Sequence, residues 1–141
     1  MATGKHSSSE ITITVDDGAG SPQAITSYVM TMGAMKITAG MTPTTAFGVA
    51  WETHLPTGLK KVEPFSLSGF WDDTATTSPH VVLVAPDSTP STASRTVTIV
   101  FGNSKTFAGE AFLTGYSVIG KAGNLTEFAA DFQPTGTWAW S

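Results

Sequence analysis

The sequence has few charged residues, and this scarcity limits the functions it can serve. Only 13% of its 141 residues are charged, about half the usual share of a globular domain. Seven Lys and Arg stand against eleven Asp and Glu, which gives a formal charge of -4. Affinity for phosphates and for anionic lipids comes mainly from basic side chains, so the composition excludes a nucleic-acid binder and a polybasic membrane contact.

Cysteine and long apolar runs are also absent. Without cysteine there are no disulfides, thiolate zinc sites or cysteine nucleophiles. The longest apolar runs, 46–51 and 81–85, are too short to cross a bilayer, and residues 1–10 lack the apolar core of a secretion signal. A hydrophobic share of 40% still suffices for a core. We therefore expect one folded domain without covalent or metal staples.

Threonine and serine supply the polarity that charge does not. The chain contains 23 Thr and 14 Ser. Free cytosolic monomers normally carry a more charged surface. The composition therefore favours a protein whose surface is mostly covered by copies of itself. Threonine also suits the solvated face of a strand, because its side chain is β-branched and polar.

Alternation of apolar and polar residues predicts a mainly β protein, a sandwich or small barrel with at most one short α-helix. The helix is expected over 74–80, capped by Asp72 or Asp73. Pro134 is expected to end the last strand. About eight short strands are predicted, over 10–15, 24–32, 35–39, 47–53, 65–71, 97–101, 107–118 and 125–133, and 81–84 is a short buried run.

Two segments depart from this rhythm. Residues 1–9 are predicted to be a flexible N-terminal arm, and residues 10–141 are predicted to form a single β domain. Residues 40–64 form a long excursion rich in glycine and proline. An excursion of this size in a compact domain is usually functional or ordered by a partner.

Motifs that carry chemistry are weak. The stretch from Gly115 to Lys121 fits the start of a phosphate-binding loop, but Ala122 replaces the required Ser or Thr and a strand follows. A hairpin turn is the better interpretation. Asp72 and Asp73 near His80 fit a helix cap better than a metal site. A Ser-His-Asp triad assembled by the fold stays open, but we expect no enzyme, and no catalytic, cofactor-binding or metal residues.

The four tryptophans, Trp51, Trp71, Trp138 and Trp140, allow three interpretations. Exposed aromatic rings could bind sugars, anchor a protein interface or belong to the core. Core or self-interface is favoured over a sugar site.

Six stretches carry a family resemblance by their order along the chain. They are Ile25–Val29, Ala46–Trp51, Leu55–Lys60, Leu67–Asp73, Gly109–Tyr116 and Glu127–Gly136. Over most of residues 10–141, the chain resembles the major tail tube proteins of long-tailed, non-contractile bacteriophages. Related folds serve the tubes of contractile tails and of type VI secretion.

The resemblance implies an assembly protein of the virion, built in the host cytoplasm. Six copies would form a ring whose inner sheets join into one continuous β-barrel, which leaves no open strand edge. Rings would stack around a tape-measure protein into a tube, bounded by tail terminator and distal tail proteins. DNA would pass through the lumen without specific binding, and neither membrane nor cofactor is implied.

Two groups of residues are expected to serve such a tube. Glu127 and Asp131, opposite the core residues Phe128 and Phe132, should face the lumen or a neighbouring subunit, where acidic groups repel DNA phosphates. The excursion should reach an adjacent subunit or ring. Its candidate contact residues are Phe47, Trp51, His54, Leu55, Leu59, Lys60 and Lys61.

Two alternatives stay open. One is a monomeric carbohydrate-binding or immunoglobulin-like adhesion module, with Trp51 or Trp71 as a sugar platform. The other keeps the phage context but changes the part to a tail terminator, distal tail protein or capsid decoration protein.

Overall fold

The computed structural model describes residues 7–17, 20–74, 78–83, 94–102 and 105–141. The described part holds nine strands, one α-helix and two 3-10 turns. The strands are β1 (Thr12–Asp16), β2 (Pro22–Ala24), β3 (Val29–Met32), β4 (Ile37–Pro43), β5 (His54–Val62), β6 (Phe65–Phe70), β7 (Arg95–Phe101), β8 (Lys105–Ile119) and β9 (Glu127–Trp140). The helix is α1 (Pro79–Leu83), and the turns are η1 (Ser8–Glu10) and η2 (Thr26–Tyr28).

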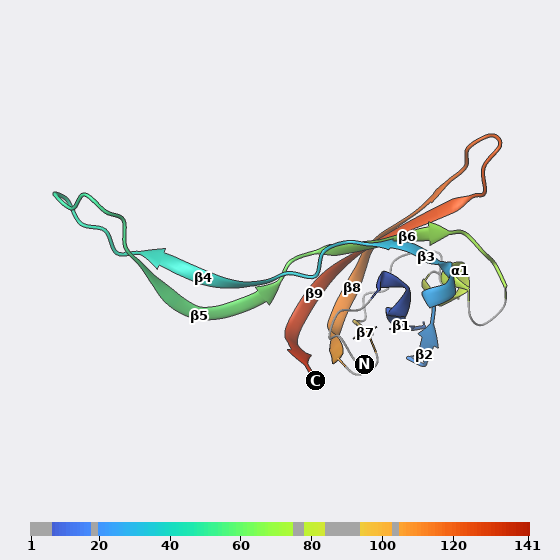
Figure 1. The fold of residues 1–141 in the computed structure, drawn as a ribbon, viewed down its shortest axis with the longest axis horizontal. Coiled ribbons are helices and arrows are strands. Elements are labelled where there is room, and N and C mark those ends of the chain that lie inside the picture. The colour runs from blue at the N-terminus through green and yellow to red at the C-terminus, as the bar shows by residue number, and fades with distance from the viewer. Residues whose placement is uncertain (1–6, 18–19, 75–77, 84–93, 103–104) are drawn as a thin grey trace.

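Seven strands form one antiparallel sheet that curls into a half-barrel (Figure 1). Their order is β2-β1-β7-β8-β9-β6-β3, so β2 and β3 lie at opposite ends of the sheet. Only residues 25–28 connect these two strands along the chain. Because an extended chain spans at most about 3.6 Å per residue, the sheet must curl to bring its ends this close. The predicted class, mainly β and barrel-like with one short helix, is confirmed.

The concave side of the sheet holds the core. Phe128 and Phe132 of β9 are each only 1% exposed, as the alternation along this strand predicts. The ring of Phe132 stacks on that of Phe65, with 5.2 Å between centroids. Trp138 packs edge-on against Phe65, and its indole N–H donates to the carbonyl of Glu110 at 3.0 Å.

The helix lies later in the chain than the sequence predicts. It spans Pro79–Leu83 rather than 74–80, and residues 75–77 are outside the described ranges. Asp72 does not cap it: its Oδ1 accepts the backbone N–H of Thr74 at 2.6 Å, and hydrogen bonding by Thr74 lowers the pKa of Asp72. Ser78 precedes Pro79, and its hydroxyl accepts the Val81 N–H at 3.4 Å. A serine cap followed by proline is a favoured helix start, whereas the threonines before it are poor helix formers.

Buried Arg95 ties this helix to the sheet. Its guanidinium donates to the carbonyls of Val82 and Leu83, at 2.6 and 2.9 Å, and to that of Asp16 at 3.0 Å. The first two carbonyls end α1, where a cation is favoured. Burial lowers the pKa of Arg95, and the carboxylates of Asp17 and Asp16 oppose that shift.

Three further predictions of strand extent were wrong. The segment 24–32 is divided, because Ile25 turns into the core between β2 and β3. Residues 47–53 form no strand but a turn with Gly48 at a positive φ of 84°. Pro134 does not end β9, which continues to Trp140. Pairing with β6 stops at Phe132, so Pro134 follows where β9 is bonded to β8 alone and a missing N–H is tolerated.

Candidate assembly interface

Strands β4 and β5 and the loop between them form a β-hairpin that projects from the body (Figure 1). This hairpin, residues 37–62, is called the arm below. Strands β4 and β5 pair only with each other, as a separate two-stranded sheet. Every residue from 41 to 61 is exposed. An isolated two-stranded hairpin is marginally stable in water, and its free edges can pair with another chain. The arm therefore presents its side chains and the free edges of both strands to solvent.

Large apolar side chains cover both faces of the arm. Met41 pairs with Pro56, and the next pair, Thr42 with Leu55, points to the other side. Phe47 is fully exposed, and Leu59 is 74% exposed. The full set of exposed large apolar residues here is Ile37, Met41, Phe47, Val49, Trp51, Leu55 and Leu59. A soluble monomer rarely displays so much contiguous apolar surface, which usually marks an interaction site.

Threonines fasten the outer end of the arm. The Thr44 N–H donates to the Thr53 carbonyl at 2.8 Å, and the hydroxyls of the same two residues lie 2.7 Å apart. The Thr53 N–H donates to the Thr45 hydroxyl at 2.9 Å. These bonds close a loop over residues 46–52, which carries Phe47 and Trp51 outward. Trp51 is 84% exposed.

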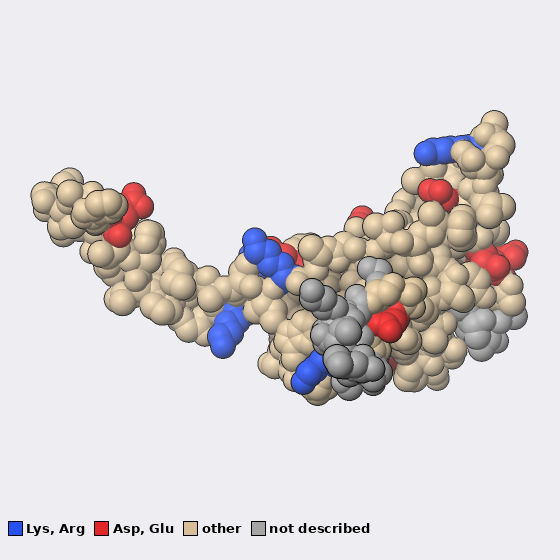
Figure 2. All heavy atoms as spheres, in the orientation of Figure 1, with Lys and Arg blue, Asp and Glu red and all other residues tan. Residues whose placement is uncertain are grey.

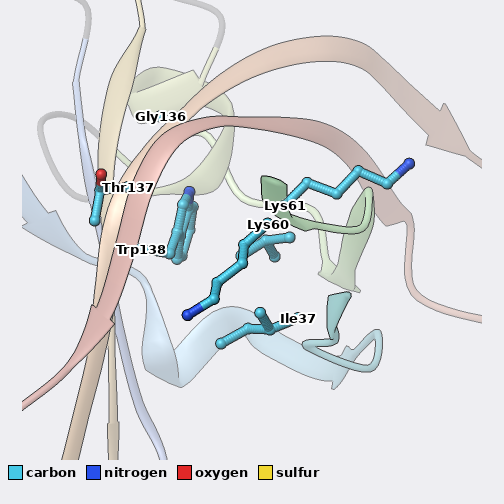
Figure 3. Close-up of a pocket in the computed structure, with 7 residues that line it drawn as sticks. Ile37, Lys60, Lys61, Gly136, Thr137 and Trp138 are labelled. Atoms are coloured by element: carbon cyan, nitrogen blue, oxygen red, sulfur yellow. The ribbon is translucent and has the colours of Figure 1, made fainter. Parts of the chain in front are cut away.

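The inner end of the arm borders a cavity of about 500 Å³ (Figure 3). Ile37, Lys60, Lys61 and Val62 line it from the arm, and residues 136–138, including Trp138, line it from β9. Figure 3 shows the ammonium of Lys60 on the same side as Ile37 and Trp138, whereas that of Lys61 extends the opposite way. Lys61 pairs with Glu63 at 3.6 Å.

Acidic residues occupy the face of the seven-stranded sheet that points away from the core, here called the open face. Glu127 and Asp131 lie on it, opposite Phe128 and Phe132 in the alternation of β9. Glu110 lies on it too, and its carboxylate accepts the Thr96 hydroxyl at 2.7 Å. Among the described residues of these seven strands, no Lys or Arg shares this face with them.

The two ends of the arm differ in charge. Figure 2 shows basic side chains near the root of the arm and at the end of the β8–β9 hairpin, and acidic atoms at the outer end of the arm. Glu52 is the only Asp, Glu, Lys or Arg between positions 41 and 59. Most of the remaining surface in this view is uncharged.

His80 belongs to an aromatic cluster. Its Nδ1 lies 3.1 Å from the Tyr116 hydroxyl, and its ring lies 5.3 Å from that of Trp71. Burial raises the pKa of Tyr116. Within the described ranges, no group of three or more His, Asp or Glu could hold a metal ion.

The predicted contact residues fall into three places. Phe47 and Trp51 lie in the outer loop, His54, Leu55 and Leu59 follow along β5, and Lys60 and Lys61 lie at the root. Glu127 and Asp131 are together on the open face. The sequence did not identify Glu52, Ile37 or Glu110 as contact residues. Alternation placed Ile37 on the apolar side of the predicted strand 35–39, and nothing distinguished Glu52 or Glu110 from the other acidic residues.

Several solved structures contain chains with a similar fold. A chain in the tail of an empty gene transfer agent particle, determined with C6 symmetry, has a TM-score of 0.75 at 13% identity over 97% of this chain and 99% of that chain. A chain in a six-fold symmetrised baseplate of the anti-feeding prophage has a TM-score of 0.74 at 12% identity over 100% and 97%. A chain in the sheath-tube complex of PVC, an extracellular contractile injection system, has a TM-score of 0.69 at 12% identity over 100% and 98%.

These likenesses show the fold and its setting in other molecules. The chain has a fold found in phage-like tails and in contractile injection systems. Because contractile systems are among them, the likeness is not specific to non-contractile tails. No protein-family model matches the sequence, and no curated protein matches it. Within the described residues, no helix has the length and apolar character needed to span a membrane.

Proposed function

We propose that this chain is a structural, non-enzymatic subunit of a phage-like tail tube. Six copies form a ring, rings stack into a tube around a tape-measure protein, and DNA passes through the lumen. The observation that carries the proposal is the arm, because residues 41–61 are all exposed and its apolar side chains lie on both faces. The C6 symmetry of the gene transfer agent tail supports a six-membered ring.

The open face is proposed to line the lumen. It carries Glu110, Glu127 and Asp131 and no described cation, and the exposed apolar side chains of Phe70 and Ile119 lie beside Glu127 in the strand pairing. A lining of this kind repels the DNA backbone instead of binding it, which suits a conduit. The arm is proposed to contact an adjacent subunit or ring through the residues predicted from the sequence. Tail terminator and distal tail proteins would bound the tube within the virion, which assembles in the host cytoplasm.

The test compares the full chain with a variant that lacks the arm. Residues 40–59 are replaced by Asn-Gly, which joins the paired residues Ala39 and Lys60 through a two-residue hairpin turn and keeps Val62 in the core. We expect rings and tubes from the full chain in negative-stain microscopy, with rising mass in sedimentation at increasing concentration. The variant should stay a folded monomer. Tubes from the variant, or a full chain that stays monomeric at every concentration, would contradict the proposal.

The same measurement separates the alternatives. A tail terminator would stop at single rings, and a carbohydrate-binding module would sediment as a monomer of 14.7 kDa. Of the two tryptophans considered for a sugar platform, Trp71 is partly buried against His80, whereas Trp51 is free. A monomer that binds sugar through Trp51 would therefore favour the second candidate function.

A further inference from the structure

We propose that the arm of one copy docks into the cavity at the arm root of a second copy, where Trp51 fills the cavity and Glu52 pairs with Lys60. This inference rests on the proposed self-assembly and names the contact that drives it. The two ends of the arm would then be complementary halves of one interface.

The outer loop of the arm cannot reach the cavity at the root of its own arm. Strand β5 is nine residues long, and extended strands rise about 3.3 Å per residue. The outer loop therefore lies roughly 30 Å from the cavity. A contact between outer end and root must join different copies, with different patches on each. Such a head-to-tail contact repeats into a closed ring or a helical stack.

Shape and polarity of the cavity suit an aromatic anchor. Ile37 and Val62 form one apolar wall and Trp138 another, around about 500 Å³. Trp51 is the most exposed tryptophan described by the structure, at 84%. Tryptophans that enter an apolar pocket on a partner carry much of the binding energy of protein interfaces.

Charge selects the outer end of the arm as the occupant. Glu52 directly follows Trp51, and Lys60 extends toward the cavity side without an ion-pair partner in the described part of the chain (Figure 3). The other exposed apolar end, the β8–β9 hairpin with Val118, Ile119 and Leu125, carries Lys121. Lys121 would repel Lys60, since charges of the same sign disfavour association.

A charge swap tests the pairing in the full-length chain. Glu52→Lys and Lys60→Glu should each raise the protein concentration at which assembly begins by about tenfold or more, measured by sedimentation and light scattering. The double variant should return close to the unchanged chain, and so should an equimolar mixture of the two single variants. Trp51→Ser should raise the threshold in every background. Circular dichroism verifies that each variant is folded.

Lys36→Glu is the matched control, because it changes the charge equally at an exposed residue beside Ile37 that is not among the residues lining the cavity. It should leave the threshold near that of the unchanged chain. Assembly that is insensitive to both single swaps, or single defects that the double variant does not rescue, would overturn the docking while the tube proposal stands. Failure of the unchanged chain to assemble would overturn the tube proposal and the docking with it.

Discussion

The half-barrel body and the arm are both built from antiparallel hairpins, but only the hairpins of the body bury one face in a core. In β9, Phe128, Ala130 and Phe132 turn into the core while their neighbours stay on the open face. In the arm, no residue from 41 to 61 is buried. Burial of apolar area is the dominant stabilising contribution in folding, so the body can fold on its own contacts and the arm cannot gain stability that way.

The distribution of apolar residues explains the difference. Strands of the body alternate apolar residues with Thr, Ser or Ala, which is typical of a sheet with one wet face. In the arm, Met41 and Leu55 lie on opposite faces. Apolar residues on both faces are typical of strands that are covered on both sides. The arm therefore has the residue pattern of strands that are covered on both faces, although its own chain leaves residues 41–61 exposed.

The largest difference between the two regions should appear when the same residue is truncated in each. Phe132→Ala removes a ring that is 1% exposed and stacked on Phe65, so we expect a loss of about 3–5 kcal/mol in the free energy of unfolding. Phe47→Ala, in the outer loop of the arm, should change it by less than about 0.5 kcal/mol. Urea unfolding below the assembly concentration measures both. Similar losses from the two variants would mean that the arm is packed against the body.

Arg95 should show the next largest effect, since it joins elements within the body. Arg95→Ala leaves the carbonyls of Val82, Leu83 and Asp16 without this donor, and we expect a loss of about 3 kcal/mol in the free energy of unfolding. Arg95→Lys should retain part of it, because an ammonium can still reach some of these carbonyls. An unchanged unfolding midpoint for Arg95→Ala would show that α1 is not fixed to the sheet by this side chain.

Much of the body could be predicted from the sequence, because alternation reports directly which face of a strand is buried. Phe128 and Phe132 were predicted inside, with Glu127 and Asp131 opposite, and the structure confirms this alternation. Helix position was missed because Asp72 satisfies a local turn with Thr74, which competes with capping. The full length of β9 was missed because the sequence does not show which side of Pro134 lacks a neighbouring strand.

The arm could be predicted only in outline. Its glycines and prolines marked residues 40–64 as unusual, but also concealed two strands of seven and nine residues. Strand pairing brings Ile37 beside Val62, and the fold brings both near Trp138. These residues are distant in sequence, and no local pattern connects them. The cavity at the arm root is therefore a property of the three-dimensional arrangement.

The hydroxyl of Tyr116 offers a smaller, pH-dependent test of the body. Burial raises the pKa of Tyr116 in the folded chain, so its neutral form is the favoured one there. The stability that this contributes is fully present below the pKa of an unfolded tyrosine, about 10, and is lost as the pH rises through the folded value. We expect the urea midpoint of the unchanged chain to fall more steeply above pH 10 than that of Tyr116→Phe. Equal slopes would show that this phenol is as accessible as one in the unfolded chain.

At neutral pH, Tyr116→Phe should lower the free energy of unfolding by about 1 kcal/mol, because it removes the hydrogen bond of 3.1 Å between the Tyr116 hydroxyl and His80. A midpoint near pH 7 that does not change would mean that water replaces this bond without loss.

Leu59→Ser should have the smallest effect on folding and therefore sharpens the contrast most. Leu59 is 74% exposed and lies in the arm, where the monomer provides no apolar surroundings to lose. We expect the free energy of unfolding of the monomer to change by less than about 0.5 kcal/mol. The concentration at which assembly begins should rise, because Leu59 is covered only in the assembled state and the substitution removes its apolar contacts there. A loss above 1 kcal/mol in the monomer would place Leu59 against its own chain, and the arm would then be part of the body rather than a surface for another copy.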